Sequence, residues 1–248
     1  ALPILTSLLD TASYNQAHKM KDFQIFEISN LNTMQENQER LAFILSGNHE
    51  VSIWQKQNLP YDFYSAKGIV ERVLFELGFA SSRIKFESNE TSDFFHPLRS
   101  AVVTIDKKVV GVMGEIHPKV AKRYDVSTVI MGEIILEKLI ELKTAKIKYS
   151  PINKLPSVVR DIALVCDEST LASDIEKVIR SVSKDMIQSV TIFDVYQGDK
   201  VEKGKKSIAL KVVYQAPDHT LSEEEITNLY QKTIEACKKG LNAELRIA

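Results

Sequence analysis

Hydrophobic residues recur along this chain with two periods, one near 3.6 residues and one of two residues. The longer period predicts amphipathic helices over residues 3–18, 62–79, 170–182 and 220–240, the last of which we expect to end at Gly240. Short helices are expected at 137–142 and at 117–124, where Pro118 suits the first helical position. The period of two predicts strands over residues 23–29, 40–47, 84–88, 100–106, 108–116, 127–136, 158–166, 187–196, 206–215 and 243–247.

The order of these predicted elements differs between the two halves of the chain. Residues 1–146 combine a mostly antiparallel sheet with flanking helices, including a hairpin that turns at 106–108. Residues 147–248 give the order βαββαβ, which is the arrangement of ferredoxin-like domains. The stretch 144–157 contains two prolines and no clear period, which indicates a linker. The predicted fold class is therefore α+β, with domains 1–146 and 147–248.

In a ferredoxin-like domain both helices cover one face of the sheet, and the other face is left open. Because side chains alternate along a strand, the apolar residues assigned to the core determine where their neighbours point. We expect Phe193 and Val195 on the covered face, which places Asp194 and Tyr196 on the open face. The same rule predicts open-face residues on the other three strands: Ala163, Ser207, Lys211 and Arg246.

The predicted open face carries a ring, small residues and hydrogen-bonding groups. Single-stranded RNA is bound on such sheets by stacking bases on a ring and reading their edges with polar groups. A neighbouring loop would attract phosphates through Lys203, Lys205 and Lys206. Tyrosine is also a good strand former, and lysine-rich turns are common solvated loops, so the pattern alone leaves both interpretations open.

Composition narrows the functional class only slightly. The 32 lysines and arginines against 33 aspartates and glutamates give a net charge of −1, which argues against a protein that coats nucleic acid through bulk charge. Cys166 and Cys237 are too few for a disulfide framework or a cysteine-type zinc site, and they favour a reducing, cytoplasmic location. The apolar runs are far shorter than the ~20 residues of a membrane helix. Because the sequence opens without Met on a helical pattern, we expect it to be part of a longer polypeptide.

The stretch "GVMGEIHPKV" contains the residues most typical of an active site. Glu115 and His117, with His96 in an earlier His-Pro pair, have the chemistry of acids, bases or metal ligands. Their spacing fits no compact ligand motif, and His117-Pro118 is also the expected start of a short helix. We therefore expect these residues to cap, pack or contact another subunit, with no catalytic or metal site here.

Four stretches of the second domain share the order and spacing of one known domain: "YSPINKLPSVVRDIALV", "FDVYQGDKVEKGKKSIALKVVYQ", "TLSEEEI" and the closing "AELR". They closely resemble the ferredoxin-fold anticodon-binding domain of the bacterial phenylalanyl-tRNA synthetase beta subunit. The first domain is similar to the catalytic-like module that precedes it, through "LTSLLDTASYN", "FQIFEIS", "DFYSAKGIVERVL" and "GVMGEIHPKV". This resemblance implies that the first domain is a class II synthetase-like antiparallel sheet with flanking helices.

The resemblance also implies a function for each domain. The open face would read the anticodon of phenylalanine tRNA through the residues that match the family, namely Ala163, Asp194, Tyr196, Ser207 and Arg246. The first domain lacks the arginine motifs of class II catalysis, so we expect it to be non-catalytic and to support a catalytic alpha subunit in an α2β2 assembly. No cofactor is expected in this part, whereas the whole synthetase would use ATP and magnesium. The apolar face of helix 3–18 is our candidate for a contact within that assembly.

Two alternative functions belong to other classes of protein. The βαββαβ domain resembles regulatory modules that bind small molecules, fused here to an independent α+β domain. That class expects a glycine-bearing loop after the first strand, and "VCDESTLAS" contains no glycine. The first domain could also be an independent hydrolase that uses Glu115 and His117.

Overall fold

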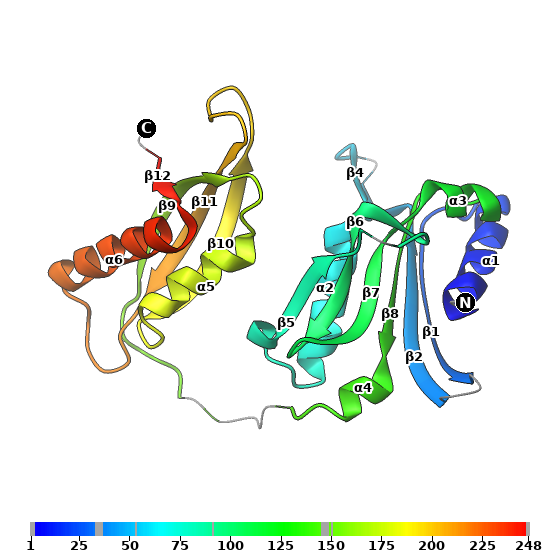
Figure 1. Ribbon diagram of the computed structural model, residues 1–248, viewed down its shortest axis with the longest axis horizontal. Helices are drawn as coiled ribbons and strands as arrows, with labels where there is room; N and C mark the ends of the chain where they lie inside the picture. Colours follow the sequence, from blue (N-terminus) through cyan, green and yellow to red (C-terminus); the bar gives the residue numbers. More distant parts are fainter. Residues whose placement is uncertain are drawn as a thin grey trace. The chain divides into compact units, whose positions relative to one another are not determined.

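The computed structural model describes residues 3–32, 37–52, 54–90, 92–144, 149 and 151–246 (Figure 1). The chain divides into two compact units, unit 1 over residues 1–148 and unit 2 over residues 149–248. Each unit has its own sheet and its own buried apolar residues. The α+β fold class predicted from the sequence is confirmed.

Unit 1 is built on a six-stranded sheet in which all neighbouring strands are antiparallel. The order across the sheet is β1-β2-β8-β7-β6-β5. The strands are β1 (Phe23–Asn32), β2 (Asn37–Ser46), β5 (Ile84–Ser88), β6 (Phe95–Ile105), β7 (Lys108–Ile116) and β8 (Val129–Ile135). The predicted hairpin between β6 and β7 is confirmed, and its turn uses the left-handed backbone of Asp106 and Lys107. A separate hairpin pairs β3 (Asn48–Ser52) with β4 (Gln57–Pro60).

Helices cover both faces of the unit 1 sheet (Figure 1). Alternation along β2 shows the arrangement, since Ala42 and Ile44 pack toward α1 (Pro3–Ala17) whereas Phe43 and Leu45 pack toward α2 (Phe63–Glu76). The short helix α3 (Pro118–Tyr124) lies on the α1 side, and α4 (Leu136–Ile140) lies on the α2 side. A 3₁₀ turn, η1 (Ser81–Arg83), precedes β5.

The apolar face of α1 is not available for an assembly contact, so that prediction is wrong. Its five apolar residues are at most 5% exposed: Ile4, Leu5, Leu8, Leu9 and Ala12. They share a core with Ala42, Ile44 and Met131 of the sheet. The physical reason is that the sheet is apolar on both faces, and α1 buries the face that α2 leaves uncovered.

Unit 2 has the predicted order βαββαβ. Its elements are β9 (Val158–Asp167), α5 (Ala172–Val182), β10 (Ile187–Tyr196), β11 (Lys205–Tyr214), α6 (Glu223–Leu241) and β12 (Glu244–Leu245). The strands lie in the order β10-β11-β9-β12, and all three pairs are antiparallel. Both helices pack on one face, where Ile162, Leu164, Leu210 and Val212 of the sheet are buried with Ile179 of α5.

The helix α6 does not end at Gly240 as predicted. It continues to Leu241 and is capped by Asn242, whose φ of 50° places it in the left-handed region that asparagine tolerates. Gly240 instead lies against α5, since a Cβ there would be 3.4 Å from Cγ2 of Val178. Among the helices of the described residues, none is long and apolar enough to cross a membrane.

Candidate nucleic-acid interface

Strand register defines the face of the unit 2 sheet that the helices leave open. On β11, Ser207 and Ala209 alternate with Ile208 and Leu210, which are buried under the helices. Tyr196 of β10 pairs with Ser207, and Asp194 pairs with Ala209. Ala209 also pairs with Ala163 of β9. We call this surface the open face. Its residues are Ala163, Asp194, Tyr196, Ser207, Ala209, Lys211 and Arg246.

Tyr196, Ser207 and Arg246 form one cluster on the open face. The backbone N–H of Arg246 donates to the carbonyl of Ala163 at 2.8 Å, which continues the β12–β9 pairing by one residue. The guanidinium carbon lies 5.7 Å from the ring centroid of Tyr196, and Nη1 lies 3.4 Å from Oγ of Ser207. Ser207 is only 3% exposed beneath this pair. Its hydroxyl oxygen accepts a hydrogen bond from Arg246 and is largely shielded from solvent.

The phenol of Tyr196 extends over the loop that follows β10. A Cβ at Gly198 would lie 2.7 Å from the Tyr196 hydroxyl oxygen, so glycine leaves the space that the phenol occupies. The Gly198 backbone therefore lies at the hydroxyl end of the ring, and the Arg246 guanidinium lies beside the ring. This arrangement orients a flat aromatic surface before any ligand binds.

The prediction that Phe193 lies on the covered face is wrong. The register between β10 and β11 shifts between Ile192 and Asp194, so Phe193 is an extra residue in a β-bulge. The ring is 56% exposed, and Nζ of Lys211 on the open face lies 5.9 Å from its centroid. Val195 pairs with the buried Ile208, as predicted for its face, yet it is 54% exposed because β10 is an edge strand.

The sequence did contain a signal for this bulge. Apolar residues follow a period of two at Val190 and Ile192, and the next residue in register with the core is Val195, three positions later. A change of phase within one strand is what an inserted residue produces. Strict alternation therefore missed Phe193 as a member of the open face.

The three lysines predicted to attract phosphate do not share one surface. Lys203 is exposed in the turn between β10 and β11. Lys205 is bonded to Glu202 at 2.8 Å, which raises the pKa of Lys205 and offsets its charge locally. Lys206 pairs with Cys166, whose side chain is in the core, so Lys206 lies on the helix side of the sheet.

In unit 1, His96, Glu115 and His117 each make a local contact. Nδ1 of His96 accepts a hydrogen bond from the backbone of Leu98 at 3.2 Å, and Glu115 is paired with Arg99 at 2.6 Å. His117 is the N-cap of α3, and its Nδ1 accepts from the backbone of Lys119 at 3.1 Å, which confirms the predicted helix start. Across the described ranges, no three His, Cys, Asp or Glu side chains are grouped to hold a metal ion.

The glycines of "GVMGEI" allow close strand packing. A Cβ on Gly111 would lie 2.4 Å from the carbonyl oxygen of Glu133, and one on Gly114 would lie 2.4 Å from Cα of Ser100. Gly114 also has a φ of 153°, next to the irregular pairing of β6 with β7. These glycines are therefore explained by the sheet itself and need no bound phosphate.

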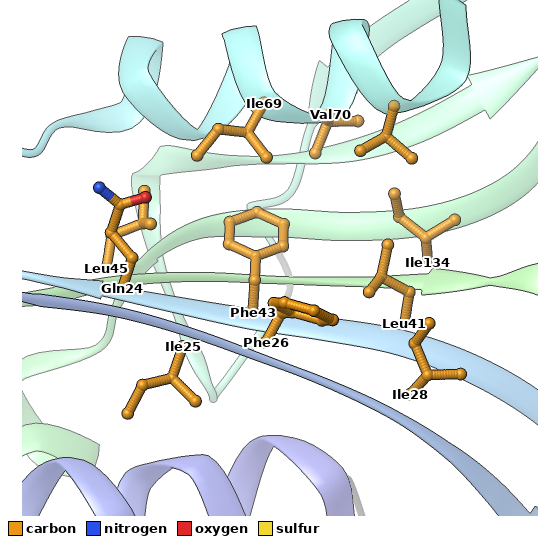
Figure 2. A pocket seen from close by; sticks show the side chains of 11 residues that line it. Gln24, Ile25, Phe26, Ile28, Leu41, Phe43, Leu45, Ile69, Val70 and Ile134 are labelled. Carbon is orange, nitrogen blue, oxygen red and sulfur yellow. The ribbon is translucent and has the colours of Figure 1, made fainter. Parts of the chain in front are cut away.

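Unit 1 also contains an apolar groove between α2 and the strands β1 and β2, with a volume of about 580 Å³ (Figure 2). Figure 2 shows Ile69 and Val70 of α2 above Phe43 of β2 and Phe26 of β1. Phe26 and Ile28 are 70% and 53% exposed, because α2 packs over β7 and β8 and leaves the edge strand β1 uncovered. The other lining residues are Gln24, Ile25, Leu41, Leu45, Val73 and Ile134.

Comparison with known proteins assigns both units to described families. Residues 3–136 match the Phenylalanyl tRNA synthetase beta chain CLM domain, and residues 153–246 match the Ferredoxin-fold anticodon binding domain. The phenylalanine–tRNA ligase beta subunits of Geobacillus kaustophilus and Bacillus subtilis are 36% and 34% identical over 249 residues. Each alignment covers 98% of this chain but 31% of the relative, so the chain spans about a third of their length.

Solved structures give a weaker likeness. The pyrrolysyl-tRNA synthetase of Desulfitobacterium hafniense is 12% identical, and the match covers 54% of this chain and 46% of that chain. The TM-score of this match is 0.40.

Proposed function

Because the chain belongs to the phenylalanyl-tRNA synthetase beta chain family, we propose that unit 2 binds the anticodon of phenylalanine tRNA on its open face. The observation that carries the proposal is the Tyr196–Arg246 pair, which presents an oriented ring beside a cation on a sheet face that no helix covers. A ring of this kind stacks an unpaired base, and polar groups beside it hydrogen-bond to base edges.

Each residue of the open face would have a separate role in this binding. Tyr196 stacks one base, and the carboxylate of Asp194 accepts hydrogen bonds from base amino groups. Ala163 of β9 and Ala209 of β11 are paired, and their small side chains let a base approach the sheet closely. Arg246 covers Ser207 in the free protein and would exchange that contact for one with RNA.

The charged residues around the open face favour RNA binding through the bases over binding through the phosphates. The residues around the open face include Asp161 and Asp194 as well as Lys211 and Arg246, and Lys205 is already paired with Glu202. Few cations are therefore available to replace counterions on the RNA. We expect binding to weaken only modestly as salt concentration rises.

Unit 1 would act as a non-catalytic support for the catalytic alpha subunit of the same synthetase. The two arginines on the strands of its sheet, Arg40 of β2 and Arg99 of β6, are engaged with Glu133 and Glu115, so neither supports a phosphate clamp for ATP. In this proposal ATP and magnesium are used by the alpha subunit during aminoacylation in the cytoplasm. The local contacts of Glu115 and His117 likewise give no support to an independent hydrolase.

The apolar groove is our candidate for the contact with the alpha subunit. Exposed apolar side chains next to an edge strand favour burial by a partner. Phe26→Asp in a full-length beta chain should reduce the amount of co-expressed alpha subunit that purifies with it. Phe75→Asp is the matched control, because Phe75 is a 59% exposed phenylalanine of α2 that does not line the groove. Equal recovery with both variants would place the contact elsewhere.

Substitution of Tyr196 tests the RNA proposal. Tyr196→Ala should weaken binding of the phenylalanine tRNA anticodon stem-loop by the ~1–3 kcal/mol of one stacked base, measured by titration of labelled RNA. Val195→Ala is the control, because this exposed neighbour on the same strand is in register with the core residue Ile208 on the other face. Unchanged affinity for Tyr196→Ala, with the wild-type melting temperature, would exclude the open face as the binding surface.

A further inference from the structure

The β-bulge in β10 adds a second aromatic ring to the open face. Thr191 pairs with Lys211 and Asp194 pairs with Ala209, so both residues are in register with open-face positions of β11. Phe193 is two residues after Thr191 and directly before Asp194, and alternation from Thr191 places its ring on the same face. Without the inserted residue, one of Phe193 and Asp194 would point toward the helices.

A cation accompanies this ring, as it accompanies Tyr196. Lys211 lies between Leu210 and Val212, which are both buried under the helices, so its side chain leaves the sheet on the open face. Its Nζ is 5.9 Å from the ring centroid of Phe193. The corresponding distance from Arg246 Cζ to the Tyr196 ring is 5.7 Å. One sheet face therefore carries two ring–cation pairs.

The two rings are attached at separate points along β10, so each can stack a different base. They are three residues apart on β10, and at ~3.3 Å per residue, with one residue inserted by the bulge, their attachment points are about 7–10 Å apart. Asp194 lies between them on the strand, opposite the small side chain of Ala209. The surface between the rings is therefore low and carries a hydrogen-bond acceptor.

We propose that Phe193 and Lys211 form a second nucleotide subsite, which stacks the base of a neighbouring nucleotide in the same single-stranded RNA loop. The ring would take the base and the Lys211 ammonium would take its phosphate, with Asp194 shared between the two bases. This subsite rests on the proposed function, since it requires RNA on the open face. It extends the binding surface along β10, beyond the five residues for which the resemblance implies an anticodon contact.

The test combines two protein variants with base deletions in the RNA. The 248-residue chain is titrated with the phenylalanine tRNA anticodon stem-loop and with stem-loops that carry one abasic nucleotide at each loop position in turn. Phe193→Ala should raise Kd about 5- to 140-fold, which corresponds to ~1–3 kcal/mol for one stacked base. That loss should disappear at one abasic position, different from the position at which the loss caused by Tyr196→Ala disappears. Val195→Ala should leave all affinities unchanged.

The outcomes separate this inference from the proposed function. If Tyr196→Ala weakens binding while Phe193→Ala binds like wild type, the subsite is wrong and the proposed function stands. If both variants lose their effect at the same abasic position, they contact a single base and the subsite is also wrong. If neither variant changes Kd, the open face does not bind RNA, and both proposals fail. Phe193→Leu keeps an apolar side chain without the ring, so a loss equal to that of Phe193→Ala supports stacking, whereas wild-type affinity for Phe193→Leu overturns it.

Discussion

A buried ion pair connects strands β2 and β8 of the unit 1 sheet. Nη1 of Arg40 on β2 donates to Oε1 of Glu133 on β8, and the two side chains are 16% and 4% exposed. Nη2 of Arg40 also donates to Oε1 of Gln38 at 2.7 Å. Within the described part of the chain, Nε of Arg40 and Oε2 of Glu133 have no hydrogen-bond partner. The pair therefore buries two charges whose hydrogen bonds are only partly satisfied.

Removing only one of these charges should lower the free energy of unfolding far more than removing both. Arg40→Met leaves the buried carboxylate of Glu133 without its cation, which should lower the free energy of unfolding by ~3–5 kcal/mol. The double variant Arg40→Met/Glu133→Leu leaves no unpaired charge and should lose less. Urea unfolding followed by circular dichroism measures both. A single variant as stable as the wild-type chain would show that the pair does not hold the two strands.

At the scale of elements, the start of α6 is fixed by side-chain hydrogen bonds. Ser222 and Glu225 form a capping box, in which the Ser222 backbone donates to Oε2 of Glu225 at 2.8 Å. This bond, a second one from the Ser222 hydroxyl and one from His219 lower the pKa of Glu225 to about 2. His219 is bonded to Asp218 and Glu225, and both bonds raise its pKa.

These shifts give the stability of unit 2 a specific dependence on pH. Ionised Glu225 stabilises the fold fully above its ordinary pKa of 4.5, and this contribution is lost as the pH falls toward about 2. Protonated His219 stabilises the fold below its ordinary pKa of 6.5, and this contribution is lost as the pH rises through its higher folded value. Glu225→Gln can keep the capping box but does not titrate, so its melting temperature should fall less than that of wild type between pH 5 and about pH 2.

Thermal melting at a series of pH values measures this difference. Glu224→Gln is the control, because Glu224 lies in the same first turn of α6 but outside the capping box. Identical pH profiles for wild type and Glu225→Gln would show that the Glu225 carboxylate does not contribute to acid stability.

The elements that the sequence predicted well are those whose periods are uninterrupted. Most helices and strands of both units follow from alternation or helical spacing, and the predicted start of a helix at Pro118 coincides with the start of α3. The hairpin of β3 and β4 was not predicted, because its largely exposed residues carry no apolar alternation. The misplaced Phe193 follows from an inserted residue, which reverses the phase inside one strand. The low exposure of Ser207 was not predictable, because it depends on how the Arg246 side chain packs after the last strand.

At the scale of the whole molecule, the balance of charge agrees with the chemistry of the open face. The 32 basic and 33 acidic residues provide no general attraction for RNA. Affinity must then come from a few stacked and hydrogen-bonded bases, which is a form of binding that depends on base identity. The proposed function therefore depends on which bases the open face binds.

The most direct measurement is the ratio of two dissociation constants for the 248-residue chain at one salt concentration. One is for the anticodon stem-loop of phenylalanine tRNA, and the other is for the same stem-loop with its three anticodon bases changed. Because each well-matched base contact discriminates by ~1–3 kcal/mol, the changed stem-loop should bind at least about tenfold more weakly. Equal dissociation constants would show that the chain binds the RNA backbone without reading the anticodon, and would contradict the proposed function.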